Sequence, residues 1–394
     1  MYFQPVDKKR ECNFIYYEGE FCRDHTSEMK KTWDYYSFLE NKEIEYANLY
    51  CGGKNLDDVC PPSLQEDWRE ITKLLKAHLR TFQEAKISLD DICFYDSVPE
   101  HFLMRYCDIK SEITKHVFDS HKKPENYDFL LELTKLVENI KNQSLDINSK
   151  SLEPKLHNFK TRQFYKKISK LDNKINYKIF GTKTGRLTTD SNSFPILTLD
   201  KDHREILIPR NDLFLELDYN AAELRVFLGL LGIPQPKEDI HTWIGENVFN
   251  GKYSRDMVKK KVFAWLYNPE AVNKELEKIF NKQKVLDKYY SNGVVKTYFG
   301  RSIETDQHHA LNYIIQSTTS DMFLRKVIDL NNFLKNKKSN IVFMIHDSVV
   351  IDFQGVEKKD INQIIDVFSN TKFGKLKINI SAGKNYGKMR SLKF

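Results

Sequence analysis

The sequence lacks any long uninterrupted apolar run, and nothing at its start resembles a leader segment. No stretch of about eighteen apolar residues occurs, although a helix that spans a membrane needs about twenty. The opening residues, Met-Tyr-Phe-Gln-Pro, contain no basic segment followed by an apolar core, which a secretory signal requires. We therefore expect a protein that is neither secreted nor membrane-spanning. Its expected location is the cytoplasm, or the host cytoplasm if the chain is viral.

Paired cysteine motifs and linker-like segments are also missing. All six cysteines lie within the first 107 residues at irregular intervals, and none belongs to a Cys-x-x-Cys motif. We expect reduced, mostly buried thiols rather than a structural zinc site. No repeat, low-complexity tract or glycine- and proline-rich linker divides the chain. Its domains are therefore expected to pack together rather than to be tethered.

The composition is that of a globular protein with a modest basic excess. With 394 residues, of which 40% are hydrophobic and 13% aromatic, the chain is long enough for two or three domains, each with its own core. Its 62 Lys and Arg against 55 Asp and Glu give a net charge of +7. Such a charge is compatible with a polyanionic partner but does not require one.

Two apolar, strand-like segments each deliver an aspartate to a strand end or turn. The first, residues 214–225, contains Asp218, and the second, residues 341–353, contains Asp347. Two carboxylates brought together make a site for divalent metal ions, and two-metal sites serve phosphoryl transfer. For either segment alone, a helix cap or a turn is the more ordinary interpretation of the aspartate. The sequence between the two segments favours the metal site.

A helix is predicted in that intervening sequence, with Ser254 as its N-cap and Pro269 as its stop. Two cations and then two aromatic residues recur along it at every fourth position. Successive members differ by only about 40° around the axis, so they form one slowly winding stripe. Cations suit phosphate and flat rings suit bases. Taken alone, the pattern also fits a basic amphipathic helix with aromatic core residues. The stripe consists of Arg255, Lys259, Phe263 and Tyr267.

These segments resemble, in the same order, the sequence motifs of the family A DNA polymerases. Residues 218–225, Asp-Tyr-Asn-Ala-Ala-Glu-Leu-Arg, resemble the first palm motif, and the stripe resembles the nucleotide-binding fingers helix. His346-Asp347-Ser348 resembles the second palm motif. The likeness covers about residues 181–355 and is weakest in the first 180 residues. Four further segments fit the family pattern: Thr184–Thr189, Asp239–His241, Gly300-Arg301 and Asn312–Asp321.

The resemblance implies an α+β fold of the right-hand polymerase type, with an antiparallel palm sheet, helical fingers and a helical thumb. A basic stretch at residues 155–170 becomes a candidate grip on duplex DNA, although such a helix is more often a solvated surface. The implied domains are an N-terminal accessory region of unknown role at residues 1–90, a thumb-like helical region at 91–180, the first part of the palm at 181–240, the fingers at 241–320 and the second part of the palm at 321–394.

The resemblance also implies template-directed DNA synthesis, in which a primer 3′-hydroxyl is extended with dNTPs by a two-metal-ion mechanism. Asp218 and Asp347, with the backbone carbonyl of Tyr219, would hold two Mg²⁺ ions, for which Mn²⁺ can substitute. Glu223 would lie beneath the sugar and disfavour a 2′-hydroxyl. The other nucleotide-binding residues would be Arg255, Lys259, Phe263, Tyr267 and His241. The residues that contact the primer-template would be Arg186, Asn312, Gln316 and His346.

The implied partners are primer-template DNA and dNTPs, with a helicase or a single-strand-binding protein as replication partners. The implied enzyme is a monomer that makes no contact with membranes. No exonuclease motif is recognisable, and the chain is short for this family. We therefore expect an enzyme without proofreading and, from its brevity and lysine-rich composition, a phage or plasmid origin.

Three departures from the family pattern bear on activity. Ser348 stands where the second palm motif usually ends in glutamate, residues 220–222 read Asn-Ala-Ala instead of Ser-Gln-Ile, and Ala264 and Asn268 replace glycines of the fingers helix. We predict an active enzyme with unusual fidelity, speed or bypass behaviour. One alternative is a catalytically weak replication accessory protein that binds primer-template junctions. The other is a primer-making or RNA-synthesising enzyme, which Glu223 argues against.

Overall fold

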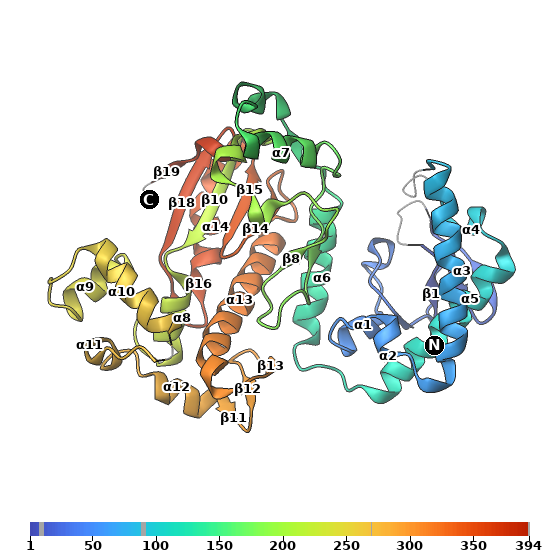
Figure 1. Cartoon of the computed structure of the whole chain (residues 1–394), viewed down its shortest axis with the longest axis horizontal. Helices are drawn as coiled ribbons and strands as arrows, with labels where there is room; N and C mark the ends of the chain where they lie inside the picture. Colours follow the sequence, from blue (N-terminus) through green and yellow to red (C-terminus); the bar gives the residue numbers. More distant parts are fainter. Residues whose placement is uncertain (8–11, 88–91, 269, 393–394) are drawn as a thin grey trace. The chain divides into compact units, whose positions relative to one another are not determined.

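The structure is a computed structural model of the chain, and it describes residues 1–7, 12–87, 92–268 and 270–392. Contacts between residues divide the chain into two compact units, Met1–Lys135 and Leu136–Phe394. Both units combine helices with strands (Figure 1), as the predicted α+β class requires. Within the described ranges, no helix is both long enough and apolar enough to cross a membrane.

The first unit begins with short strands. Its first three strands pair antiparallel in sequence order, and the next two pair parallel with each other. The second and third strands form a hairpin that turns at Glu18 and Gly19, and both residues have positive φ (49° and 87°), as a tight two-residue turn favours. The strands are β1 (Gln4–Pro5), β2 (Ile15–Tyr17), β3 (Glu20–Cys22), β4 (Lys31–Thr32) and β5 (Glu45–Tyr46).

Helix α5 (Glu100–Ser120) is the centre of the first unit, and it packs against β1 and against all four helices that precede it. The longest helix before it is α3 (Gln65–Glu84). Its Trp68 ring stacks on Tyr106 of α5 with centroids 5.7 Å apart. The other helices are α1 (Ala47–Tyr50), α2 (Leu56–Val59), α3 (Gln65–Glu84) and α4 (Phe94–Ser97), with 3-10 turns at Ser37–Leu39 and Pro62–Leu64.

The cysteines depart from the expectation at two positions. Cys12 and Cys93 form a disulfide, so the expectation of reduced thiols is wrong for this pair. The bond joins residues 81 positions apart, which is why no local motif indicated it. Cys51, Cys60 and Cys107 are free and buried, as expected, and Cys22 is free and half-buried.

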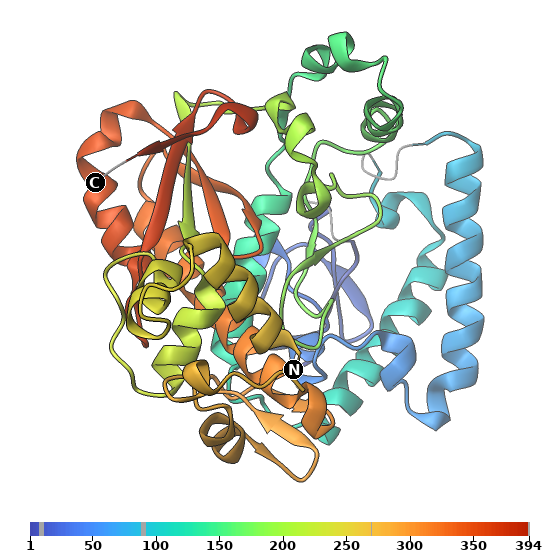
Figure 2. The ribbon, with the colours of Figure 1, turned by 60° about the vertical axis from the view of Figure 1, so that its left-hand side comes forward.

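The second unit is built on a five-stranded antiparallel sheet with the order β14-β15-β10-β18-β19. The strands coloured yellow-green and red in Figure 2 form this sheet. The hairpin between β14 and β15 turns through His346 and Asp347, and His346 has a φ of 54°. The strands are β10 (Leu213–Tyr219), β14 (Asn340–Ile345), β15 (Ser348–Phe353), β18 (Ile378–Gly383) and β19 (Arg390–Leu392).

The two faces of this sheet differ in chemistry because side chains alternate along each strand. On one face, Tyr219 of β10 stacks on Phe368 of α14 (Ile361–Ser369), with ring centroids 4.4 Å apart. Helix α13 (Gln307–Leu334) packs against α14 and covers the same face. The opposite face carries the polar residues of β10, among them Asp218. The aspartate is therefore held by a strand whose apolar face is anchored in the core.

Helices follow β10 beyond the end of the sheet that carries Asp218 (Figure 1). Helix α8 follows β10 after Ala221, which has a φ of 52°. The helix predicted to begin after Ser254 is confirmed as α10 with Ser254 as its N-cap, and the predicted stop at Pro269 lies outside the described residues. The helices are α8 (Ala222–Leu230), α9 (Ile240–Asn247), α10 (Arg255–Tyr267), α11 (Lys274–Glu277) and, next along the chain, α12 (Lys282–Tyr289).

The remaining elements of the second unit are short, apart from α6 (Tyr127–Lys141), which crosses the boundary between the units, and α7 (Phe159–Ile168). Small sheets pair β6 with β9, β7 with β8, β16 with β17, and β11 with β12 and β13. Their bounds are β6 (Asp146–Ile147), β7 (Tyr177–Lys178), β8 (Thr188–Thr189), β9 (Leu207–Ile208), β11 (Tyr290–Ser291), β12 (Val294–Lys296), β13 (Ser302–Glu304), β16 (Asn370–Thr371) and β17 (Gly374–Lys375), with 3-10 turns at Ser149–Lys155, Ile196–Thr198, Lys201–Ile206, Gly355–Asp360 and Tyr386–Lys388.

Candidate active site

The sheet brings together the two segments that carry the aspartates. Asp218 lies near the end of β10, where it pairs with Ser348 on β15 and with Asn379 on β18. Asp347 is the residue before Ser348 and occupies the hairpin turn. The backbone N–H of Tyr219 donates to the Asp347 carbonyl at 3.5 Å. Strand register therefore sets the two carboxyl groups beside each other.

Burial makes both carboxyl groups resist ionisation. It raises the pKa of Asp218 to about 7, and the charges of Asp347 and Glu216 contribute in the same direction. The Asn379 amide, which donates to Asp218 at 3.1 Å, opposes that rise. Burial also raises the pKa of Asp347, whereas a backbone hydrogen bond and the cations of His346 and Arg186 lower it. The raising effects exceed the lowering ones, so the pKa of each carboxyl group lies above its ordinary value.

The donor set fits a divalent cation that is shared with a substrate. Carboxylate oxygens are preferred ligands of Mg²⁺, which commonly takes one or two carboxylates together with water and substrate phosphates. A cation would relieve the repulsion between Asp218 and Asp347. Over the described residues, no group of three or more His, Cys, Asp or Glu side chains is arranged to hold a metal ion. The protein alone therefore offers two acidic ligands and not a closed cage.

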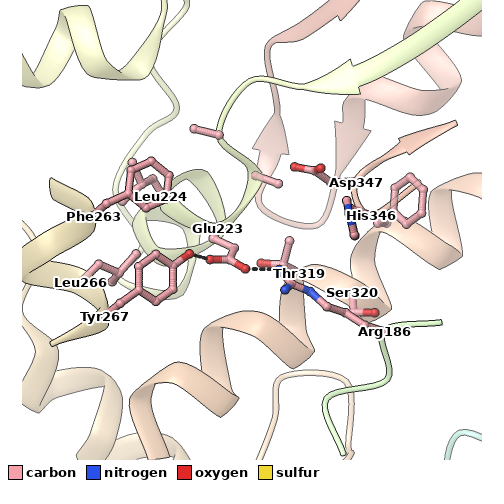
Figure 3. Close-up of a pocket in the computed structure, with 13 residues that line it drawn as sticks. Arg186, Glu223, Leu224, Phe263, Leu266, Tyr267, Thr319, Ser320, His346 and Asp347 are labelled. Atoms are coloured by element: carbon pink, nitrogen blue, oxygen red, sulfur yellow. Dashed lines mark hydrogen bonds and ion pairs between the residues drawn. The ribbon is translucent and has the colours of Figure 1, made fainter. Parts of the chain in front are cut away.

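A cavity of about 210 Å³ opens beside Asp347 between α8, α10 and α13 (Figure 3). At its centre the Glu223 carboxylate accepts hydrogen bonds from the Arg186 guanidinium and from the Tyr267 hydroxyl. Burial raises the pKa of Glu223, and the Arg186 charge opposes that rise. Six of the predicted site residues line this one cavity: Arg186, Glu223, Phe263, Tyr267, His346 and Asp347.

The predicted stripe on α10 faces outward. Phe263 and Tyr267 stack nearly parallel with centroids 5.6 Å apart, and they are 37% and 42% exposed, so the alternative of aromatic core residues is wrong. The core side of α10 is formed by other residues, including Val262 and Trp265. Lys259 places its Nζ atom 5.8 Å from the centre of the Phe263 ring. The stripe therefore offers a cation and two ring faces to the outside of the helix.

Asn312 and Gln316 lie on α13 and are half-buried, but they do not line the cavity. The cavity wall on α13 is formed further along the helix by Thr319, Ser320 and Phe323. His241 is 3% exposed, and its ring centroid lies 6.1 Å from that of Phe263. Burial lowers the pKa of His241, and its buried Nδ1 atom has no hydrogen-bond partner within the described part of the chain.

Comparison with known proteins gives a result at the level of structure only. No protein-family model matches the chain, and no curated protein matches its sequence. Among solved structures, one similar chain is the POL domain of Pol1 from M. smegmatis in complex with DNA primer-template and dNTP. The TM-score is 0.56 at 11% identity, over 73% of this chain and 75% of that chain. The fold is DNA polymerase-like.

Sequence reasoning missed the residue that holds Arg255 in this polymerase-like fold. Arg255 donates to both carboxylate oxygens of Asp239, at 3.0 and 2.8 Å. Asp239 also caps α9 by accepting from the backbone N–H groups of His241 and Thr242, both at 3.1 Å. Hydrogen bonds from Arg255, Asn220 and the cap hold the pKa of Asp239 well below its usual range, although burial opposes them. The first cation of the stripe is therefore already paired.

The Asn220 departure has a structural use. Its side-chain amide donates to Asp239 at 2.8 Å, and its side-chain oxygen accepts from Arg225 at 3.1 Å. Arg225 is fully buried and also donates to the carbonyls of Pro236 and Glu238, at 2.8 and 2.7 Å. A fully buried guanidinium needs such partners, because an unpaired one would carry a large desolvation cost. Asn220 and Arg225 thus tie the end of β10 to the start of α9.

Proposed function

We propose that this protein is a template-directed DNA polymerase of family A that extends a primer 3′-hydroxyl with dNTPs. The observation that carries the proposal is the convergence of Asp218 and Asp347 beside a cavity that contains the Arg186–Glu223–Tyr267 cluster. The similar solved structure holds DNA primer-template and dNTP, which supports the same ligands here. The protein would act as a monomer, with a helicase or single-strand-binding protein as replication partners and without proofreading.

Asp218 and Asp347, with the Tyr219 carbonyl, would hold two Mg²⁺ ions. When bound, such ions activate the attacking hydroxyl and neutralise charge on the triphosphate and the leaving pyrophosphate. The protein's own part is positioning and charge stabilisation, because phosphoryl transfer needs little other covalent help. Lys259 faces outward for the phosphates, and Arg255 would join it by leaving Asp239. His241 would be a third phosphate contact.

Glu223 would select the sugar. Its carboxylate is fixed from two sides by Arg186 and Tyr267, so that it cannot swing away easily from a 2′-hydroxyl. The stacked, exposed rings of Phe263 and Tyr267 would receive the base. Ala264 and Asn268 are also exposed on α10, and their side chains would crowd the nascent pair where glycines are usual.

Primer-template DNA would be contacted by Arg186, His346, Asn312 and Gln316, and by the cations of α7. We assign the palm to residues 181–240 and 321–394 and the fingers to 241–320. Residues 91–180 would form the thumb, and residues 1–90 an accessory region. The unit boundary at Lys135 lies inside this thumb region, so α5 belongs to the first unit and α7 to the second.

Extension of a labelled recessed DNA primer with Mg²⁺ and dNTPs tests the proposal, with a parallel reaction that contains rNTPs. We expect extension by the wild-type protein, none by D218A or D347A, and normal extension by D172A, which removes an exposed aspartate. No extension by the wild type, together with tight binding to the primer-template junction, would instead favour the catalytically weak accessory protein.

The DNA-binding role of α7 has its own test. Lys160, Lys166 and Lys167 are exposed, whereas Lys155 forms an ion pair with Glu205 at 2.6 Å. We expect K160A/K166A/K167A to weaken primer-template binding and to flatten its salt dependence, since each lost phosphate contact lowers the log–log slope by about 0.9. K155A is the matched control with little expected effect. An unchanged salt slope in the triple variant would contradict the assignment.

A further inference from the structure

The face of the central sheet that carries Asp218 also carries a third carboxylate. Residues two apart on a strand share a face, so Glu216 lies on the same side of β10 as Asp218. Residues directly opposite on neighbouring strands share a face too. Ser348 lies opposite Asp218 on β15, and Ser381 lies opposite Glu216 on β18. These four side chains form a contiguous polar group.

Three hydroxyl groups fix the Glu216 carboxylate. Ser381 and the buried Tyr386 donate to it at 3.0 and 3.1 Å, and the Ser348 hydroxyl, 3.4 Å away, has one proton that it shares between this carboxylate and the Ile345 carbonyl. Among the described residues, no Lys, Arg or His comes within ion-pair distance of Glu216. Arg204 lies beside Tyr386, 4.8 Å from the centre of its ring. Neutral donors orient the carboxylate without cancelling its negative charge.

Ser348 links this carboxylate to the hairpin that carries Asp347. Its hydroxyl lies within hydrogen-bond distance of Glu216 and, at 3.1 Å, of the Ile345 carbonyl at the end of β14. A longer acidic side chain at position 348 would itself supply a carboxylate here. In this chain Glu216 of the neighbouring strand β10 supplies the carboxylate, and the short side chain of Ser348 leaves room for it.

We infer that Glu216 is a positioning residue for the divalent-cation site of Asp218 and Asp347. Its carboxylate takes the role of the acidic side chain that is absent at position 348. This inference rests on the proposed function. Glu216 adds negative charge behind the two ligands and, through Ser348, holds the turn that presents Asp347. A purely structural carboxylate would satisfy the same three hydroxyls but would leave cation affinity unchanged when replaced by an isosteric amide.

The test is titration of the full-length protein with Mn²⁺ in the absence of DNA, with free Mn²⁺ measured by electron paramagnetic resonance. D218N identifies the signal of this site. We expect E216Q to weaken Mn²⁺ binding about tenfold, the low end of the effect of losing an outer partner of a metal ligand. E216D, which keeps the charge, should recover most of the affinity. E304Q, at an exposed position on β13, is the control for net charge and should bind as the wild type does.

A second pair of variants keeps the test independent of how E216Q folds, which circular dichroism monitors. E216Q/S348E and E216Q/S348Q carry side chains of the same shape and differ only in one carboxylate. We expect the first to bind Mn²⁺ about as tightly as the wild type and the second to bind more weakly. Equal affinities within this pair, or wild-type affinity in E216Q, would overturn the inference.

The outcomes separate this inference from the proposed function. If the wild type fails to extend a primer but its Mn²⁺ affinity depends on both Asp218 and Glu216, the polymerase proposal fails and the role of Glu216 stands. If extension depends on Asp218 and Asp347 while E216Q binds Mn²⁺ normally, the polymerase stands and Glu216 is structural. Mn²⁺ binding that D218N leaves unchanged would overturn the role of Glu216 together with the metal site.

Discussion

The central sheet and helix α10 form two sides of the candidate active site by different physical means. On the sheet, strand register places Asp218 beside the turn of Asp347, and burial raises the pKa of both carboxyl groups. On α10 the side chains of the predicted stripe are exposed, and two of them form hydrogen bonds within the protein, Arg255 with Asp239 and Tyr267 with Glu223. In the proposed function the sheet side would bind a cation directly, whereas side chains on the helix side would first have to leave their partners within the protein.

The largest expected effect concerns the sheet side and pH. Because burial raises the pKa of Asp218 to about 7, protons compete with the cation below that value. We expect Mn²⁺ affinity to rise about a hundredfold between about pH 5 and pH 7, roughly tenfold per unit. Titrations at a series of pH values measure this slope. D218N should remove it, and a slope that persists in D218N would mean that another group titrates.

The raised pKa of Asp218 also predicts that the stability of the metal-free protein changes with pH in the opposite direction to Mn²⁺ affinity. The pKa of Asp218 in the folded state lies above the unfolded value of about 3.9. The folded protein therefore binds more protons in this range, and the free energy of unfolding should fall as pH rises from about 4 to about 7. Urea unfolding of wild type and D218N across this range measures the contribution, which saturating Mn²⁺ should offset.

A smaller effect is expected on the helix side. Arg255 forms an ion pair with Asp239, whereas Lys259 lies beside the Phe263 ring. We expect K259A to raise the KM for dNTPs about tenfold or more, as for loss of a hydrogen bond to a charged group, and R255A to raise it less. Steady-state single-nucleotide extension measures both variants. The opposite order would show that Asp239 preorganises Arg255 for the phosphates instead of competing with them.

The smallest effect is expected from the hydrogen bond between Tyr267 of α10 and Glu223 in the cavity. Y267F removes the hydroxyl that donates to Glu223 but keeps the ring, and Arg186 still holds the carboxylate. We expect the preference for dNTPs over rNTPs to fall by about threefold to tenfold, the range for one hydrogen bond. The ratio of kcat/KM values for matched nucleotides gives the answer. E223A is the reference for full loss, so Y267F should never exceed it.

The parts that could be predicted from the sequence depend on local signals. Apolar runs that end at Asp218 and surround Asp347 indicated strands, and the structure has them as β10 and the β14–β15 hairpin. Ser254 as N-cap indicated where α10 begins, and the recurrence of cations and aromatic residues at every fourth position indicated its exposed stripe. Periodicity and capping act over a few residues, so one sequence suffices to detect them.

The parts that could not be predicted are pairings across the fold. Arg255 finds Asp239 16 positions away, and Tyr386 finds Glu216 170 positions away. No local pattern distinguishes such partners from any other charged or polar residue. For Glu216, its spacing of two from Asp218 on a predicted strand was a usable signal, because it places both acids on one face. The spacing alone did not indicate that Ser348 and Ser381 lie beside Glu216 on the neighbouring strands, and those neighbours suggest its role.

The loop before Arg186 has a further consequence for how the cavity can move. Gly185 has a φ of 76°, and the space that a side chain there would need is filled by the Arg301 guanidinium. Arg301 is in turn bound to the buried Asp321 of α13 at 2.6 Å. Arg186, which donates to Glu223, therefore follows a loop residue that packs against Arg301 and, through Arg301, is linked to α13. Helix α13 forms another wall of the same cavity. We expect the loop and α13 to move together when the cavity opens.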